Sequence, residues 1–326
     1  MKRRKFLTTT AQAVSVAACS PLFSMVTMQT LNAQIPAPPG MGKSSKPQLA
    51  LTLDDPRTNL ENVMSWPEAN SRLLKAISAS NVRVALFVAG MRVDDAEGAK
   101  LISAWDQAGH IVANHSYSHL YYGPNTTYSE FAVDFLRNEK IIAPYHNRKQ
   151  FFRYPFLKEG DSAAKRDQFR ALLKERGYRV GHVTIDASDW YVDQRYRDRS
   201  VQQPKTPVAP YRDFLIAHLL DRATYYRQLA IDVLGRDIRH TILMHYTVLN
   251  ALVLGDVMTA FERAGWQWID ASVAFEDPVF RSEAKTVPAG ESLVWALAKE
   301  TGKFPQLRYP GEDDIYERPK LDSLGL

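Results

Sequence analysis

The chain has 326 residues, of which 45% are hydrophobic, 24% charged and 11% aromatic. This balance excludes collagen-like, low-complexity and wholly disordered chains, and the length allows one large α/β domain or two smaller ones. The net charge of the chain is +5, and the first 34 residues contribute four positive charges and no negative one. The rest of the chain therefore has a net charge of +1, which does not indicate a nucleic-acid partner. The single cysteine, Cys19, lies there too, so a chain processed beyond it has no disulfide and no thiol chemistry.

The first 34 residues have the pattern of an export signal. A basic run at positions 2–5, with two adjacent arginines that resemble a twin-arginine signal, precedes the uncharged stretch 6–34. Cleavage after Ala33 would release a soluble protein, whereas cleavage before Cys19, at a sequence resembling a lipoprotein box, would leave a lipid anchor there. A transmembrane anchor is disfavoured because the stretch contains many Thr and Gln residues. We therefore expect an exported protein of the periplasm or cell envelope, without a membrane span in the mature chain.

Residues 35–47 form a linker by their Pro, Gly and Ser content, and strands alternate with amphipathic helices in the domain 48–278. The predicted strands are 49–53, 82–88, 110–113, 151–154, 180–185, 241–245 and 266–269. The predicted helices are 69–79, 96–108, 130–142, 163–176, 211–234 and 257–264. The alternation predicts an α/β fold with a mainly parallel sheet, and it is compatible with both a closed barrel and an open sheet. The extension 279–326 contains one predicted helix, 293–299, and its role stays open.

The first predicted strand ends in two aspartates, Asp54 and Asp55, followed by Pro56. Adjacent carboxylates on an extended chain point to opposite sides, so that one can face a metal ion while the other takes a different role. A turn or a helix N-cap is the alternative, because Asp-Asp-Pro is also good turn material.

Two histidines, His115 and His119, follow the third predicted strand. Side chains four residues apart share a face on one helical turn, where two imidazoles can bind one metal ion. The pair lacks the glutamate of the His-Glu-x-x-His motif, which disfavours a zinc protease of that type.

Three further polar residues, Arg153, Asp189 and His245, lie at the carboxyl ends of later predicted strands. Each has an ordinary structural explanation on its own: a surface ion pair, a helix cap and a buried imidazole. The carboxyl edge of a parallel sheet is, however, where α/β proteins assemble their sites. Their shared position at this edge therefore favours a common functional site.

Taken together, these stretches resemble the motifs of polysaccharide deacetylases, the NodB-homology domain of carbohydrate esterase family 4. They occur in the family's order between residues 48 and 275. The five stretches are 51–55 (LTLDD), 109–119 (GHIVANHSYSH), Arg153 with Pro155 and Phe156, Asp189 with Trp190, and Leu243 with His245. In this chain Leu53 replaces the usual aromatic residue and Pro56 replaces the glycine after the two aspartates.

The resemblance implies a distorted (β/α)7 barrel and metal-dependent removal of N-acetyl groups from an amino-sugar polysaccharide. It implies that Asp55, His115 and His119 hold one divalent ion, zinc first, with cobalt or nickel as alternatives. The partner it implies is an acetylated polysaccharide or amino-sugar oligomer.

The resemblance also assigns roles to other residues. Asp54 would be the general base, held in place by Arg153, and His245 would be the general acid, oriented by Asp189. Further residues would bind the substrate. The backbone N–H of Phe156 would bind the oxyanion, Trp190 and Leu243 would form an apolar wall, and Tyr154 and Tyr191 would stack on sugar rings.

Two other functions stay open. A hydrolase of the same fold could act on another non-peptide C–N bond, such as that of a cyclic amide or ureide. A non-catalytic carbohydrate-binding protein is the second alternative, although Asp54, Asp55, His115, His119 and His245 are all present. We further expect the extension 279–326 to pack across the barrel and narrow the substrate groove.

Overall fold

The computed structural model describes residues 46–60, 63–308 and 314–326. The predicted export signal, Cys19 and nearly all of the predicted linker lie outside these residues. Within the described part of the chain, no helix combines the length and the apolar character needed to cross a membrane.

Seven parallel strands form the main sheet of the described residues, in the order β6-β4-β3-β2-β1-β7, with β8 paired to the start of β1. The strands of this sheet are β1 (Gln48–Asp54), β2 (Ala85–Val88), β3 (Ile111–Asn114), β4 (Arg148–Phe152), β6 (Arg179–Val180), β7 (Arg239–His245) and β8 (Gln267–Trp268). The predicted parallel sheet is confirmed. Almost all of β1 is buried, because it has neighbours on both sides and helices outside.

The sheet closes on itself through one segment of chain. Val180 of β6 pairs with β4, and the Gly181 N–H donates to the carbonyl of Phe152 at 2.7 Å. A few residues later Ile185 forms a parallel bridge with Ile242 of β7. The same segment thus joins both edges of the sheet, and the fold is a distorted (β/α)7-type barrel rather than an open sheet.

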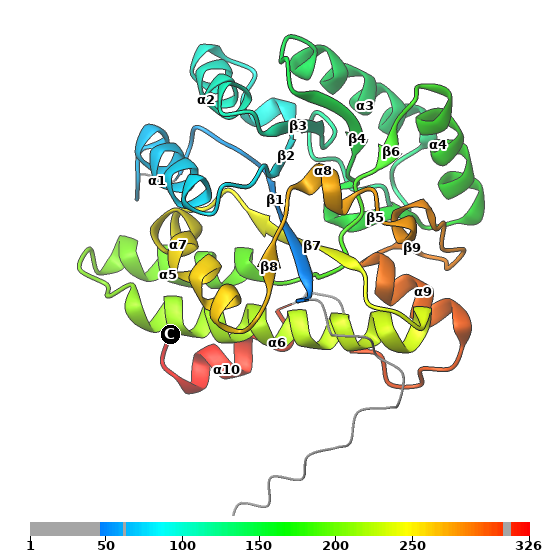
Figure 1. Ribbon diagram of the computed structural model, residues 1–326. Coiled ribbons are helices and arrows are strands. Elements are labelled where there is room, and N and C mark those ends of the chain that lie inside the picture. The colour runs from blue at the N-terminus through cyan, green and yellow to red at the C-terminus, as the bar shows by residue number, and fades with distance from the viewer. Residues whose placement is uncertain (1–45, 61–62, 309–313) are drawn as a thin grey trace, which may run out of the picture. The chain divides into compact units, whose positions relative to one another are not determined.

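Helices surround the strands, as Figure 1 shows. They are α1 (Trp66–Ala79), α2 (Ala96–Gln107), α3 (Tyr128–Ile142), α4 (Ala163–Glu175), α5 (Asp189–Gln202), α6 (Ala209–Leu234), α7 (Val248–Arg263), α8 (Ala271–Ala274), α9 (Leu293–Thr301) and α10 (Arg318–Ser323). Several begin at a residue whose side chain accepts a backbone N–H of the first turn, and these residues are Ser65, Asp95, Thr127, Ser162 and Thr247.

Several elements differ from the prediction. Strands β5 (Lys158–Gly160) and β9 (Ala289–Gly290) and helices α5, α8 and α10 were not predicted, and the predicted strand 180–185 is a strand only as β6 (Arg179–Val180). Helix α5 was not predicted, because its sequence is polar on every side and has no apolar stripe. Helix α7 begins at Val248, nine residues before the predicted start, since Thr247 caps it directly after β7. Asp189, predicted to follow a strand, is instead the first residue of α5.

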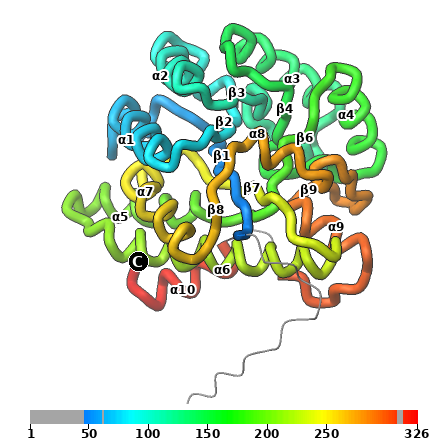
Figure 2. The backbone as a smooth tube through the Cα atoms, viewed as in Figure 1, coloured from blue at the N-terminus to red at the C-terminus, as the bar shows by residue number. Residues whose placement is uncertain are grey.

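The extension after residue 278 is integrated into the domain. Its short strand β9 (Ala289–Gly290) pairs antiparallel with β5 (Lys158–Gly160). The Ser292 hydroxyl donates to the Thr184 carbonyl at 2.9 Å, and Figure 2 shows α10 beside α6. No described residue of the extension lines the cavity at the carboxyl edge of the strands. The expectation that the extension narrows the groove is therefore wrong for these residues.

Glu317, near the end of the chain, forms an ion pair with Arg222 of α6. The side chains of Glu317 and Arg222 are fully buried, and their charged groups lie 3.1 Å apart. His218 Nδ1 is 3.4 Å from the same carboxylate oxygen. The extension thus supplies the counter-charge of a buried arginine.

Replacing Glu317 by alanine is expected to lower the free energy of unfolding by about 3–5 kcal/mol, because the buried charge of Arg222 loses its carboxylate. Denaturant unfolding of the folded chain measures this loss. Glu97→Ala is the control: Glu97 is exposed and forms a surface ion pair with Lys100, so that its removal should cost less than about 1 kcal/mol. Equal losses in the two variants would contradict the structural role of Glu317.

Candidate metal and active site

A cavity of about 370 Å³ opens at the carboxyl edge of the strands. Its lining includes the predicted residues Asp54, Asp55, His115, His119 and His245. They come from the ends of β1 and β7 and from the loop after β3. The barrel therefore brings together residues that lie up to 191 positions apart in the sequence.

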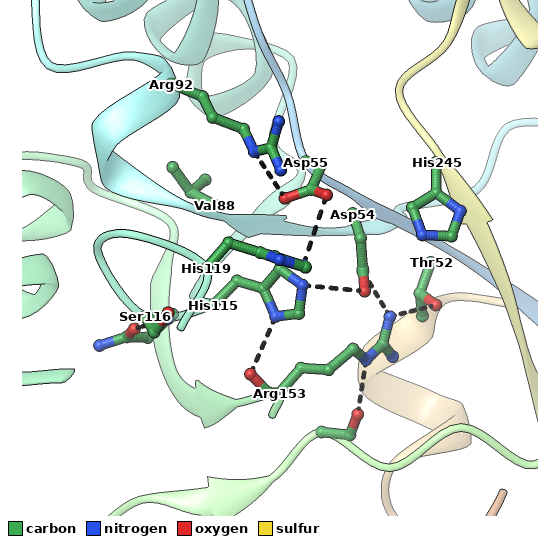
Figure 3. Close-up of polar contacts among 12 residues, drawn as sticks. Thr52, Asp54, Asp55, Val88, Arg92, His115, Ser116, His119, Arg153 and His245 are labelled. Atoms are coloured by element: carbon green, nitrogen blue, oxygen red, sulfur yellow. Dashed lines mark hydrogen bonds and ion pairs between the residues drawn. The ribbon is translucent and has the colours of Figure 1, made fainter. Parts of the chain in front are cut away.

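Asp55, His115 and His119 form one cluster, in which the three potential ligand atoms all lie within 4.8 Å of one another. Asp55 Oδ2 is 3.5 Å from His119 Nε2 (Figure 3). His115 Nδ1 is 2.9 Å from the Arg153 carbonyl, which fixes the ring so that Nε2 faces the aspartates. One carboxylate and two imidazoles are a common ligand set for a catalytic metal ion.

The protonation of the cluster suits a divalent cation. Burial lowers the pKa of both His115 and His119 to about 4, so that both rings are neutral near pH 7 and keep a lone pair for a metal. Burial opposes the charge of Asp55, but the neighbouring His119, His115 and Arg92 hold the pKa of its carboxyl group well below the usual range. Asp55 Oδ1 lies 3.1 Å from Arg92 Nε, and Asp55 Oδ2 is the oxygen that faces His119. The residues present therefore fit a divalent ion.

The prediction placed His115 and His119 on one helical turn. In the structure they lie in a loop instead. Ser116 and His119 have φ values of 62° and 58°, a left-handed conformation that bends the chain back on itself. Asn114 Oδ1 accepts the Ser116 N–H at 2.9 Å, and Asp134 of α3 accepts the N–H groups of Tyr117 and Ser118. Contacts with α3, rather than helical periodicity, hold the pair together.

The two aspartates also depart from the predicted extended arrangement. Asp55 has φ 62°, so that the chain turns directly after β1 and both carboxylates reach the same cavity. Asp54 Oδ1 accepts a hydrogen bond from Arg153 Nη1 at 2.6 Å, and Arg153 also donates to Thr52 Oγ1 at 2.9 Å (Figure 3). Burial raises the pKa of Asp54 to about 6, although the charge of Arg153 opposes the rise. Asp54 is thus a proton acceptor whose pKa lies near neutrality.

His245 and Asp189 form the second polar pair of the cavity. His245 Nδ1 donates to Asp189 Oδ1 at 2.7 Å, and Asp189 Oδ2 accepts the His245 N–H at 2.7 Å and the Asn250 side chain at 2.6 Å. Burial opposes the positive charge of His245, but Asp189, with smaller contributions from Asp54 and Asp55, raises the pKa of the imidazole to about 9. His245 is therefore protonated at neutral pH and can donate a proton.

The predicted substrate-binding residues divide into two groups. Phe156, Trp190, Leu243 and Tyr154 line the cavity, and the Phe156 ring stands edge-on to His119. Tyr191 is buried in the main hydrophobic cluster and does not line the cavity of the described residues. Its predicted stacking on a sugar ring is therefore wrong.

Sequence reasoning missed several polar residues of the cavity lining. They are Arg57, Arg92, Asp193, Gln194 and Arg197. Arg92 follows the carboxyl end of β2, so the rule that located the other strand-end residues would have found it. Arg197 and Asp193 lie on α5, the helix that the apolar pattern did not reveal.

Residues 41–181 match the family model of polysaccharide deacetylases. The chain is similar to the solved structure of peptidoglycan deacetylase PdaC from Bacillus subtilis, at 21% identity over 71% of this chain and 91% of that chain, with a TM-score of 0.47. For the family 4 carbohydrate esterase from Streptomyces lividans in complex with acetate, the identity is 18%, the coverage 70% and 95%, and the TM-score 0.46.

A third similar structure is a mutant, with restored enzymatic activity, of a CE4 family pseudoenzyme from Bacillus anthracis. Here the identity is 18%, the coverage 71% of this chain and 68% of that chain, and the TM-score 0.48. Among curated protein sequences, none matches the chain.

The family match includes the first three motifs, with Asp54, Asp55, the two histidines and Arg153, and ends before Asp189 and His245. The fold brings His245 into the same cavity, and Asp189 reaches the site through its hydrogen bond to His245. The resemblance seen in the motifs is confirmed over residues 41–181, which match the polysaccharide deacetylase family model.

Proposed function

We propose that the protein is an exported, metal-dependent deacetylase that hydrolyses N-acetyl groups of an amino-sugar polysaccharide. The family match supports the polysaccharide class, and the first 34 residues of the sequence support export. One observation carries the proposal. The cluster of Asp55, His115 and His119 shares a cavity with a proton acceptor, Asp54, and a proton donor, His245.

Asp55, His115 and His119 would hold the divalent ion, which would supply Lewis-acid chemistry by acidifying a water molecule and polarising the acetamide carbonyl. Asp54 takes a proton from the attacking water, and the buried guanidinium of Arg153 keeps its carboxylate oriented. With a pKa near 6, Asp54 is ionised in most molecules at neutral pH.

His245 protonates the departing amine nitrogen, because an unprotonated amide anion is a very poor leaving group. Asp189 orients the ring through Nδ1 and leaves Nε2 for the substrate. The backbone N–H of Phe156 stabilises the negative charge that develops on the carbonyl oxygen. Trp190 and Leu243 form the apolar wall for the acetyl methyl group.

The test is acetate release from a panel of N-acetylated glycans by purified protein reconstituted with zinc. Release is expected with zinc and not after chelation, and Asp54→Asn is expected to lower kcat by about 10²–10⁴, because the general base is lost. Asp256→Asn is the control, because Asp256 is an exposed residue of α7 that lies 3.6 Å from Arg212 and does not line the cavity. Bound zinc without acetate from any glycan would favour the C–N hydrolase alternative. Release that does not depend on Asp54 would contradict the mechanism.

A further inference from the structure

Two exposed aromatic rings lie beside the cavity. Among the large hydrophobic side chains that are exposed in the described residues, only Tyr121 and Phe156 are aromatic, and each is 46% exposed. Their ring centroids lie 5.6 Å apart, with the two rings nearly perpendicular at 86°. Single exposed hydrophobic residues are common on protein surfaces, whereas neighbouring ones beside a site mark a place where a ligand binds.

The pair is continuous with the proposed metal site. Phe156 lines the cavity, and its ring centroid lies 4.6 Å from that of His119, a proposed metal ligand. Tyr121 comes two residues after His119 in the chain and packs edge-on against Phe156. The two rings thus extend the cavity wall onto the neighbouring surface.

The loop of Tyr121 holds its ring in place. The Thr126 hydroxyl donates to the Tyr121 carbonyl at 2.7 Å, and Lys165 Nζ of α4 donates to the Gly123 carbonyl at 2.8 Å. The Tyr121 ring lies so close to Gly123 that a Cβ at this glycine would come within 2.1 Å of a ring carbon. A ring that is already held in place loses little conformational entropy when a ligand binds to it.

Phe156 is held in place by its backbone. Its φ of 56° is in the left-handed region, which is uncommon for residues other than glycine. The next residue, Leu157, donates its N–H to the Tyr154 carbonyl at 3.0 Å and closes the turn around Phe156. The surrounding structure therefore maintains an unfavourable conformation in which the Phe156 ring is half exposed beside the cavity.

The cavity itself is small in comparison with a polysaccharide. Its volume of about 370 Å³ lies near the lower end of the roughly 300–1,000 Å³ that is usual for ligand pockets. The proposed function places one acetamide group there, so that the neighbouring sugars of a chain must lie on the surface outside it. A pyranose ring has an apolar face of C–H groups, which packs well against an aromatic ring.

We propose that Tyr121 and Phe156 form an aromatic platform that binds the pyranose ring next to the sugar whose acetamide is hydrolysed. This inference rests on the proposed function, and it deepens that function by naming the substrate class: a glycan of at least two sugar residues rather than a free amino sugar. Covering the two half-exposed rings supplies affinity. Because the platform is fixed relative to His119, it also determines which acetamide group of the chain reaches the metal site.

The test compares kcat/KM for acetate release from N-acetylglucosamine and from its linear dimer and tetramer, with the zinc-loaded protein. The wild-type protein is expected to prefer the tetramer to the monomer by about tenfold or more, because contact with an aromatic side chain typically contributes a factor of about this size. In Tyr121→Ala this preference is expected to fall about tenfold, mainly through a higher KM for the tetramer.

Two further variants and a control sharpen the test. Tyr121→Phe keeps the aromatic ring and should keep the preference. Gly123→Ala keeps Tyr121 but displaces its ring, and it should lower the preference as Tyr121→Ala does. The matched control is Val133→Ala on α3, which removes exposed apolar surface that does not line the cavity and should leave the wild-type preference unchanged.

The outcomes separate this inference from the proposed function. Equal kcat/KM for monomer and tetramer, or an unchanged preference in Tyr121→Ala, overturns the platform while acetate release still supports the deacetylase. A wild-type dimer that Tyr121→Ala converts to a monomer in size-exclusion chromatography would assign the two rings to self-association and also overturn it. If no sugar releases acetate, the proposed function fails. Calorimetric binding of the N-acetylglucosamine tetramer then decides the inference: weaker binding by Tyr121→Ala supports the platform, and equal binding or none overturns it.

Discussion

Replacing His119 by alanine is expected to abolish acetate release and to weaken zinc binding by about 100-fold or more. His119 supplies one of the three atoms of the cluster, and even residues that only support a metal ligand typically contribute 10–100-fold to affinity. The ring also packs against Phe156, so that the variant opens a small gap at the cavity wall. Competition titration with a zinc chelator measures the affinity of the purified protein.

His146→Ala is the control for His119→Ala, because His146 is exposed and lies outside the cavity. It should bind one zinc ion per chain with wild-type affinity. A His119→Ala protein that binds zinc as tightly as the wild type would show that the cluster of Asp55, His115 and His119 is not the metal site.

Replacing Asp189 by asparagine is expected to lower kcat/KM by about 10²–10⁴ at pH 8. In the wild type, the Asp189 carboxylate helps to raise the pKa of His245 to about 9 against the effect of burial. The proton donor is therefore present below about pH 9 and is lost as the pH rises through that value. Without the Asp189 carboxylate, the smaller contributions of Asp54 and Asp55 remain against the effect of burial, so that the pKa of His245 falls and the alkaline decline of activity begins at a lower pH.

The measurement is the pH dependence of kcat/KM for the wild type and Asp189→Asn, with circular dichroism to verify folding. Asp256→Asn again serves as the control and should keep the wild-type profile. A smaller activity with an unchanged alkaline limb would mean that Asp189 supports the structure without setting the protonation of His245.

Residues at the strand ends were predictable because their position follows from local sequence. Asp54, His115, Arg153 and His245 each end or directly follow an apolar run with β propensity. Parallel strands place their carboxyl ends at one edge, so the same residues meet whatever the details of the helices. This rule was sufficient to place these residues at one edge, whereas their roles as metal ligand, base and acid came from the resemblance to the deacetylase motifs.

The path of the chain between the strands was less predictable. Helix α5 lacks an apolar stripe, yet its first residue, Asp189, forms the pair with His245. The bends at Asp55, Ser116 and His119 use left-handed backbone conformations, which are uncommon for residues other than glycine. Hydrogen bonds from distant parts of the chain, such as those of Asp134 to the His115–His119 loop, stabilise them.

The sequence by itself determined the α/β class, the alternation of strands and helices and the residues at the carboxyl edge, because burial and local propensity act over a few residues. Only the tertiary structure decided the closure of the barrel at Ile185, the integration of the extension through Glu317 and the presence of arginines such as Arg197 in the cavity lining. Each of these depends on contacts between residues far apart in the chain. Such contacts leave no periodic signal in the sequence, and the energy of a buried charge appears only when its partners are in place.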